Sequence, residues 1–257
     1  MNQIALLSLA ADLARQAGEV ILAVRGRGFA TTQKADRSPV TEADHLAEAL
    51  INAGLRAATP RYPVIAEEEA AAGQHHEAGE TYWLVDPLDG TREFAAGRDA
   101  FTVNIGLIHA GRPVLGVVGV PAHGELFGGI VARDGHPALA WKRTSAGERP
   151  IAVRAPPPEG LTVLASSYSA AHPRLAAFLA ERRVVSLENY GSALKIVRVA
   201  EGAADLYPRM GRTMEWDTAG PQAVLEAAGG HLLDLGGVAL GYGKPAWENP
   251  DFICVGR

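Results

Sequence analysis

The chain has 257 residues, of which 47% are hydrophobic and 21% charged, a balance typical of a globular protein with a sizeable core. Its 24 Lys and Arg against 29 Asp and Glu leave a formal net charge of −5, which excludes the broad basic surface of a polynucleotide-binding protein. We find no apolar run of about 18 residues and only one cysteine, so we expect no membrane span, no intramolecular disulfide and a cytoplasmic location.

Residues 1–154 are expected to form an α+β half. Apolar positions recur at helical spacing from about residue 4 to residue 24, without the basic region and apolar core of a signal peptide. A loop over 31–39 precedes a second helix, for which Thr41 is the predicted N-cap and Asp44 lies one turn in. Short apolar runs at 63–66 and 82–85 have strand composition, and both run directly into carboxylates.

The pattern then changes to β-rich runs separated by glycine, which predict an antiparallel meander over residues 101–132. The Ala-Pro-Pro-Pro-Glu-Gly stretch at 155–160 is the strongest linker signal. Beyond it, residues 161–257 alternate between strands and helices, which predicts an α/β second half. Its expected elements are a strand at 161–165, a helix from about 173, a strand at 184–185, a helix from about 192, a strand near 205–207 and a helix over 217–228.

An acidic turn follows the predicted strand at 82–85. Asp86 ends the apolar run, Pro87 forces a turn, and Asp89 follows three residues after Asp86, so both carboxylates can face one point. The carbonyl of Leu88 can add a third oxygen, and oxygen ligands are those that Mg²⁺ prefers. Such a turn is by itself most often an ordinary surface turn.

Three further segments, taken together with this turn, favour a functional site. Gly90 and Thr91 are predicted to open a short helix whose backbone N–H groups point toward a phosphate. Glu67 also follows an apolar strand, and clustered carboxylates are costly without cations. Asp217 alone would be read as a helix N-terminal acid. Together these segments predict a carboxylate cluster that holds metal and receives a small phosphorylated substrate.

Two stretches resemble the signatures of the inositol monophosphatase superfamily of lithium-sensitive phosphatases. They are Trp-Leu-Val-Asp-Pro-Leu-Asp-Gly-Thr-Arg-Glu-Phe at 83–94 and Glu-Trp-Asp-Thr-Ala-Gly at 215–220. Within the superfamily, the stretches at 38–41, 191–195 and 199–209 are most similar to the bacterial 3'(2'),5'-bisphosphate nucleotidases. The resemblance covers roughly residues 38–230.

The resemblance implies a layered αβαβα fold with the site between the two halves, and a role in clearing by-products of sulfate assimilation. The implied reaction is Mg²⁺-dependent hydrolysis of 3'-phosphoadenosine 5'-phosphate to AMP, with two or three metal ions. It leaves open a homodimer and peripheral association with the inner membrane. The implied metal ligands are Glu67, Asp86, the Leu88 carbonyl, Asp89 and Asp217.

The remaining implied roles concern water and substrate. Thr91, paired with Asp44, would orient and activate the attacking water. The implied substrate-binding residues are Gly90, Thr91, Ser192, Lys195 and Arg209. The sequence departs from its relatives at Ala-Ser-Ser-Tyr, residues 165–168, where they carry a stretch like Ser-Arg-Ser-His; Tyr168 stands in place of the histidine.

Two alternatives stay open at this point. Phosphatases of inositol phosphate or histidinol phosphate share the same core motifs, so the exact substrate is not decided. A catalytically silent metal- or lithium-binding regulator is a second alternative, against which the Asp44 and Thr91 pair argues. A role of Lys34 or Asp36 facing substrate or metal is open, and His75 and His76 are expected to be solvated.

Overall fold

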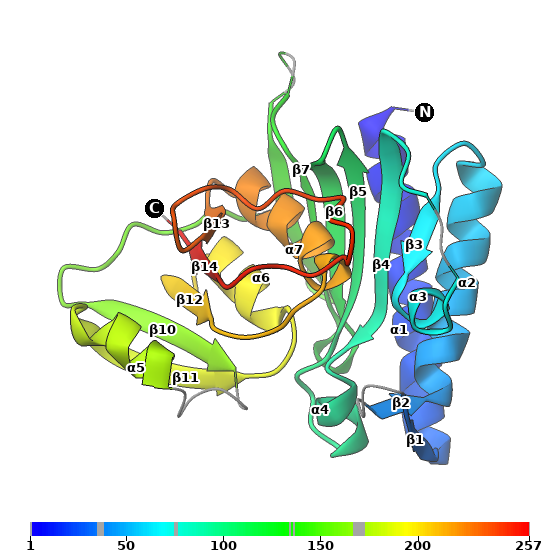
Figure 1. Cartoon of the computed structure of the whole chain (residues 1–257), viewed down its shortest axis with the longest axis horizontal. Helices are drawn as coiled ribbons and strands as arrows, with labels where there is room; N and C mark the ends of the chain where they lie inside the picture. Colours follow the sequence, from blue (N-terminus) through cyan, green and yellow to red (C-terminus); the bar gives the residue numbers. More distant parts are fainter. Residues whose placement is uncertain are drawn as a thin grey trace.

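The computed structural model describes residues 2–34, 39–74, 77–133, 135, 137–166 and 173–256. Layers of helix and sheet alternate through the molecule, which confirms the predicted αβαβα sandwich (Figure 1). From one side to the other these layers are α1 with α2, a seven-stranded sheet, α6 with α7, a five-stranded sheet, and α5. No helix in these ranges is both long and apolar enough to cross a membrane.

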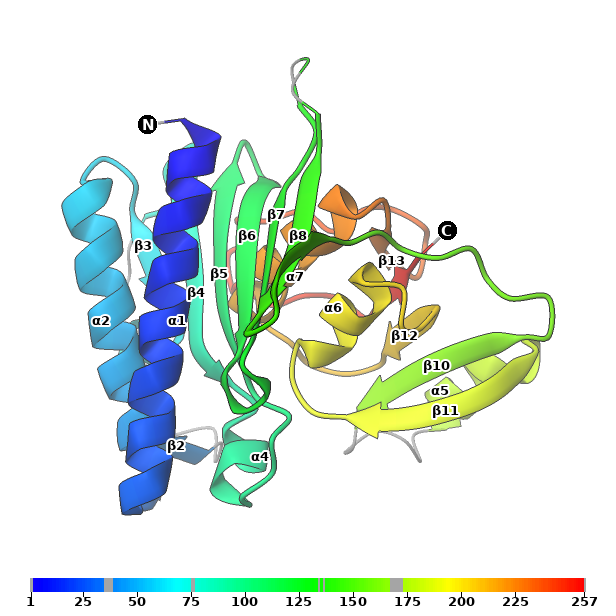
Figure 2. The ribbon, with the colours of Figure 1, turned by 180° about the vertical axis from the view of Figure 1, so that it is seen from behind.

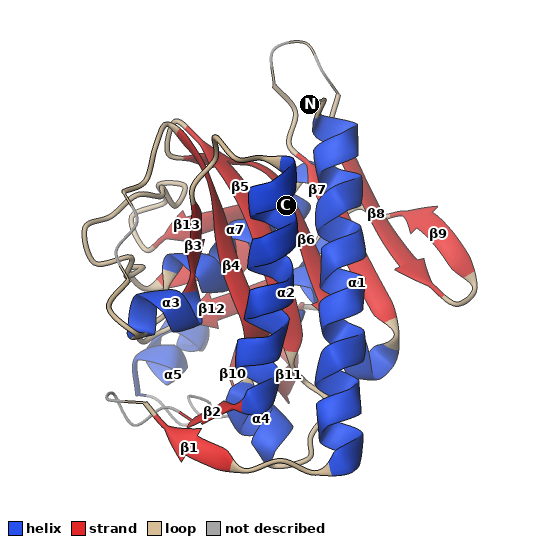
Figure 3. Ribbon diagram, turned by 90° about the vertical axis from the view of Figure 1, so that its right-hand side faces the viewer, coloured by secondary structure: helices blue, strands red, loops and turns tan. Residues whose placement is uncertain are grey.

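Two antiparallel helices cover the outer face of the large sheet (Figure 3). α1 spans Gln3–Arg27, and its small apolar residues at helical spacing, such as Ala10, Ala14 and Ala17, are fully buried against the sheet. α2 spans Glu42–Ala58 and begins with the predicted cap, since Thr41 and Asp44 form a capping box. The small β1 (Thr31–Gln33) and β2 (Pro39–Thr41) pair beside its start, in the segment that was expected to be a loop.

The large sheet has the strand order β3-β4-β5-β6-β7-β8-β9. Only β3 and β4 pair in parallel, and the remaining strands form the predicted antiparallel meander, which β8 and β9 extend. Short helices α3 (Glu67–Ala71) and α4 (Thr91–Ala95) follow β3 and β4, and the 3₁₀ turn η1 (Pro121–His123) follows β6. The strands are Val64–Ala66, Thr81–Asp89, Thr102–His109, Arg112–Val120, Glu125–Ile130, Leu139–Thr144 and Gly147–Pro150.

The chain then runs through the linker to the second sheet without regular structure except a turn at its end (Figure 2). That sheet has the order β11-β10-β12-β14-β13. Its strands are β10 (Leu161–Ser166), β11 (Val184–Tyr190), β12 (Leu206–Arg209), β13 (His231–Asp234) and β14 (Phe252–Val255), and its helices are α5 (Pro173–Ala180), α6 (Leu194–Ala200) and α7 (Glu215–Ala227). β13 and β14 were not predicted, α6 and α7 begin at Leu194 and Glu215 instead of near residues 192 and 217, and Cys254 is buried on β14.

Helix α7 lies between the two sheets and touches the large one through glycine. A Cβ atom on Gly220 would lie 2.7 Å from the carbonyl oxygen of Ile105, and one on Gly116 would lie 2.3 Å from the Gly220 carbonyl oxygen. Only glycine permits this approach. One hydrophobic cluster joins β6 and β7 to α6, α7 and β14, so the two predicted halves share a core; their division at residues 155–160 stays a prediction.

Candidate active site

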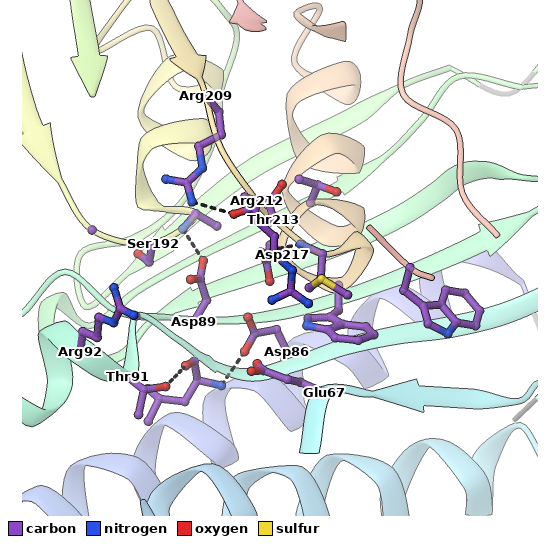
Figure 4. A pocket seen from close by; sticks show the side chains of 18 of the residues that line it. Glu67, Asp86, Asp89, Thr91, Arg92, Ser192, Arg209, Arg212, Thr213 and Asp217 are labelled. Carbon is purple, nitrogen blue, oxygen red and sulfur yellow. Dashed lines mark hydrogen bonds between the residues drawn. The ribbon is translucent and has the colours of Figure 1, made fainter. Parts of the chain in front are cut away.

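A cavity of about 1020 Å³ opens where the ends of β4 and β12 meet the first turns of α3, α4, α6 and α7. Figure 4 shows its side chains converging from both halves of the chain. Every residue implied as a metal ligand or substrate contact lines this cavity, and Asp44 lies behind its wall. The lining members are Glu67, Asp86, Leu88, Asp89, Gly90, Thr91, Ser192, Lys195, Arg209 and Asp217.

The acidic turn at the end of β4 is built by local contacts. Asp86 is 1% exposed, and its Oδ1 accepts a hydrogen bond from the Leu88 amide at 3.0 Å. The pairing of β4 with β5 shifts register between Asp86 and Asp89, which are the last paired residues of β4. This irregularity lets both carboxylates reach the cavity. Gly90 then adopts the left-handed region, with φ of 93°, and α4 begins.

Thr91 is held between two oxygen acceptors. Its hydroxyl lies 3.0 Å from Asp44 Oδ1 and 3.1 Å from the Leu88 carbonyl oxygen. The other oxygen of Asp44 accepts hydrogen bonds from the backbone amide and the hydroxyl of Thr41 at 2.8 and 2.7 Å. Burial raises the pKa of Asp44 above its ordinary value, while these hydrogen bonds oppose the rise. The structure therefore brings together the pair that the sequence placed 47 positions apart.

Asp89 connects the large sheet to the turn before α6. Its Oδ2 accepts a hydrogen bond from the Ala193 amide at 2.6 Å and another from Asn104 Nδ2 at 3.4 Å. Burial raises the pKa of Asp89 to about 6, although the positive charge of Lys195 and the Ala193 amide oppose that rise. This hydrogen bond to Ala193 thus connects the acidic turn to the second half of the chain, which forms the other side of the cavity.

Asp217 completes the acidic wall from the first turn of α7, where its Oδ2 accepts a hydrogen bond from the Met214 amide at 2.9 Å. Burial and the nearby charges of Asp89 and Glu67 raise its pKa to about 8. Burial also raises the pKa of Asp86 well above its ordinary value, and Glu67, which lies within hydrogen-bond reach, adds to the rise. Such mutual repulsion in a buried site is relieved by a bound cation.

The donor set suits a hard divalent cation, because four carboxylates and the Leu88 carbonyl are all oxygen ligands. Within the residues that the structure describes, no three His, Cys, Asp or Glu side chains stand in a ready metal-binding arrangement. Glu67 Oε1 lies 2.6 Å from Lys34 Nζ, which also contacts Glu68 at 2.6 Å. The chemistry of the site fits a metal, and the ligand assignment stays a prediction.

Lys195 and Ser192 shape the turn before α6. Lys195 is 2% exposed and donates to the carbonyl oxygens of Tyr190 at 3.0 Å and Ser192 at 2.5 Å. Burial lowers its pKa to about 7, and the charge of Asp89 opposes that fall. Ser192 holds a left-handed φ of 51°, and its hydroxyl accepts the Leu194 amide at 3.2 Å. These contacts favour a role of Lys195 in holding the turn, and its contact with a second phosphate stays a prediction.

Arginine side chains line the cavity beyond the acidic wall. Arg209 donates from Nη2 to the Arg212 carbonyl oxygen at 2.9 Å, and its buried Nε has no hydrogen-bond partner among the described residues. Arg92 and Arg212 also line the cavity (Figure 4). Sequence reasoning did not assign these two a role, although Arg92 directly follows Thr91 in the acidic motif. Three arginines thus line the cavity beside its carboxylates, and one of them, Arg212, also pairs with Glu248 at 3.3 Å.

Several other candidates are only partly placed. Lys34 forms ion pairs with Glu67 and Glu68, and a role of Lys34 facing substrate or metal stays a prediction. Asp36, His75, His76 and Tyr168 lie outside the described residues.

The sequence pattern of the inositol monophosphatase family matches residues 3–255. The chain belongs to this family.

Individual relatives carry the comparison further. The chain is 41% identical over 251 residues to the 3'(2'),5'-bisphosphate nucleotidase CysQ of Escherichia coli, covering 96% of this chain and 98% of the relative. A solved structure of CysQ from Bacteroides thetaiotaomicron is 33% identical, covers 98% of both chains and superimposes with a TM-score of 0.78. An inositol monophosphatase from Anabaena is 26% identical, covers 100% of this chain and 92% of its own, and gives a TM-score of 0.75.

Proposed function

We propose that this member of the inositol monophosphatase family is a cytoplasmic, Mg²⁺-dependent phosphomonoesterase that hydrolyses the 3'-phosphate of 3'-phosphoadenosine 5'-phosphate to AMP and phosphate. The observation that carries the chemistry is the Thr91–Asp44 hydrogen bond at the edge of the four carboxylates that line the cavity. The likeness to 3'(2'),5'-bisphosphate nucleotidases over nearly the whole chain supports the substrate class. A homodimer stays a prediction.

The carboxylates of Glu67, Asp86, Asp89 and Asp217 and the Leu88 carbonyl would hold the metal. Bound Mg²⁺ supplies positive charge that lowers the pKa of a ligated water and neutralises the phosphate oxygens. Thr91 and Asp44 handle the proton of the attacking water. As water attacks phosphorus, the Thr91 hydroxyl accepts its proton and passes its own to Asp44 Oδ1, along the hydrogen bond already present. The bond from phosphorus to the ribose 3' oxygen breaks, and that oxygen takes up a proton from solvent water. The raised pKa of Asp44 makes it a better acceptor than an exposed aspartate.

The leaving oxygen and the rest of the nucleotide face the second half of the chain. Arg209 on β12 is the cation best suited to bind the second phosphate. It lines the cavity, and its buried Nε has no hydrogen-bond partner among the described residues. A charge-assisted hydrogen bond to a second phosphate contributes about 1.5–3 kcal/mol. We therefore assign recognition of the second phosphate chiefly to Arg209.

An inositol-phosphate phosphatase is the second candidate, and one observation favours it. Lys195 is turned onto two backbone carbonyls, so one cation that the nucleotide assignment relied on is already engaged. The shared fold of inositol monophosphatases is compatible with either substrate.

Steady-state kinetics with Mg²⁺ on 3'-phosphoadenosine 5'-phosphate and inositol 1-phosphate separate the two candidates. We expect the bisphosphate to have the higher kcat/KM, and Arg209→Ala to lower this preference at least about tenfold while hydrolysis of a simple monophosphate is largely kept. Arg143→Ala is the matched control, since Arg143 is exposed on β8 and pairs with Glu148 away from the cavity. A higher kcat/KM for inositol 1-phosphate, or equal losses on both substrates, would overturn the nucleotidase assignment.

A further inference from the structure

Helix α2 buries two acidic side chains one turn apart. Asp44 is 1% exposed and Glu48 is 5% exposed, and both face the sheet side of the helix. Like charges at positions i and i+4 destabilise a helix, and a buried carboxylate needs hydrogen-bond partners. Asp44 has its partners in Thr41 and Thr91. Glu48 needs hydrogen-bond partners of its own.

Both carboxylate oxygens of Glu48 accept hydrogen bonds from the first turn of α3. Oε2 accepts a hydrogen bond from the Glu68 amide at 2.7 Å, and Oε1 accepts one from the Glu69 amide at 2.9 Å. The N-cap residue of α3, Ala66, has no side chain that could satisfy these amides. Glu48 thus caps α3 from another helix, 20 and 21 positions earlier in the chain.

The capped turn begins with Glu67, the residue that the proposed function makes a metal ligand. Three consecutive glutamates at this point repel one another, and Glu68 is itself buried. Two contacts from α2 hold the turn in place: Glu48 on the backbone amides, and Arg56, whose guanidinium pairs with both oxygens of Glu69 at 3.0 and 2.6 Å. The direction in which Glu67 leaves the backbone is set by this turn.

We propose that Glu48 is a positioning residue that aims Glu67 at the metal site. Because Asp44 lies one turn earlier on the same helix and holds Thr91, α2 places the proton acceptor and a metal ligand at a fixed separation. The inference rests on the proposed metal role of Glu67. Outer partners of metal ligands typically change metal affinity 10- to 100-fold when removed.

The test is calorimetric titration of the metal-free full-length chain with Mg²⁺. Glu48→Gln removes the charge and one of the two acceptor oxygens, so an amide of α3 faces an NH₂ group. We expect its Kd for Mg²⁺ to rise about 10- to 100-fold, and that of Glu67→Gln to rise at least as much. The Mg²⁺ concentration for half-maximal activity should rise in parallel.

The control variant is Asp205→Asn, which alters another buried carboxylate that accepts a backbone amide, that of Thr162, directly before β12 of the second sheet. It should lower the unfolding midpoint and leave Kd for Mg²⁺ unchanged. If it weakens Mg²⁺ binding as much as Glu48→Gln does, the effect is general loosening and the proposal fails. If Glu48→Gln does not fold, Glu48→Asp, shorter by one methylene, should still bind Mg²⁺ several-fold more weakly than wild type; unchanged affinity there refutes the proposal.

A double variant separates the positioning role of Glu48 from the metal-binding role of Glu67. If Glu48 acts through Glu67, the Glu48→Gln/Glu67→Gln protein binds Mg²⁺ no more weakly than Glu67→Gln alone, whereas independent effects multiply. Wild-type affinity in Glu67→Gln would refute the proposed metal role of Glu67. A weakened Glu67→Gln beside an unaffected Glu48→Gln would refute only the positioning role.

Discussion

The orientation of the Thr91 hydroxyl is set by two neighbouring oxygen atoms. It contacts both Asp44 Oδ1 and the Leu88 carbonyl oxygen, so it lies between the proposed proton acceptor and a proposed metal ligand. The pKa of a threonine hydroxyl lies far above 7, so the hydroxyl stays protonated near neutral pH. It therefore cannot deprotonate water by itself. The role that we propose for Thr91 is therefore to orient water and to pass a proton to Asp44, a buried carboxylate whose pKa is raised.

We expect Thr91→Ala to lower kcat by about 10²–10⁴-fold, the range for loss of a general acid–base contact. Kd for Mg²⁺ should change far less, because the hydroxyl is proposed to handle water and not to hold the cation. Thr91→Ser keeps the hydroxyl and should restore much of the rate. Parallel measurement of kcat and of Mg²⁺ binding by calorimetry checks this, and a variant that loses both together would show that Thr91 is chiefly a metal ligand.

At the scale of the elements, α7 carries Asp217 and is held by its contact with the large sheet. The close approach at Gly116 and Gly220 leaves no room for a side chain on either surface. Any added atom must push α7 outward, and Asp217 lies in its first turn. Packing at the middle of the helix is thus coupled to the position of a proposed ligand at its end.

Gly116→Ala should destabilise the protein by about 1–3 kcal/mol, the usual cost of overpacking a core, and should weaken Mg²⁺ binding as α7 shifts. Gly26→Ala is the matched control: it lies in the last turn of α1 and its Cβ would meet nothing within 4 Å. That change should be neutral or stabilising by up to about 1 kcal/mol, because alanine favours helix. Urea unfolding measures both; an equally stable Gly116→Ala protein would refute the packing argument.

At the scale of the whole molecule, one ion pair connects the linker to the second sheet. Arg154 donates from Nε and Nη2 to the two carboxylate oxygens of Asp205 at 2.7 and 2.8 Å, and the Thr162 amide donates to the same group at 2.8 Å. Asp205 is buried where β10 and β12 lie side by side. The pair therefore fixes how the chain enters its second half.

This pair predicts a pH dependence of stability. Burial raises the pKa of Asp205, and the hydrogen bonds from Arg154 and Thr162 lower it by more, so the net shift is downward. A carboxylate whose folded pKa lies below its unfolded value of about 3.9 stabilises the fold above that pH, and the contribution is lost as pH falls through the folded pKa. The stability difference between wild type and Asp205→Asn should be constant from pH 5 to about 7 and should shrink below about pH 4. Chemical denaturation across this range measures it, and a difference independent of pH would show that the Asp205 charge is not involved.

The sequence by itself determined what depends on short stretches of chain. The acidic turn at 86–91, the cap of α2 and the meander are made by contacts between residues close in sequence or by simple alternation, so pattern and spacing were sufficient. The family followed from the same motifs, because their order and spacing extend across the chain.

The tertiary structure decided what depends on contacts between distant segments. β14 pairs with β12, which lies more than 40 residues earlier in the chain, and β13 then pairs with the other side of β14. The resemblance implied that Lys195 binds substrate, yet folding buries its Nζ over the Tyr207 ring and against two backbone carbonyl oxygens. No local pattern marks Glu48, yet in the fold its carboxylate accepts hydrogen bonds from the first-turn amides of α3. The hydrogen-bond partners of buried polar groups depend on how whole layers pack together. No local stretch of sequence is therefore sufficient to predict them.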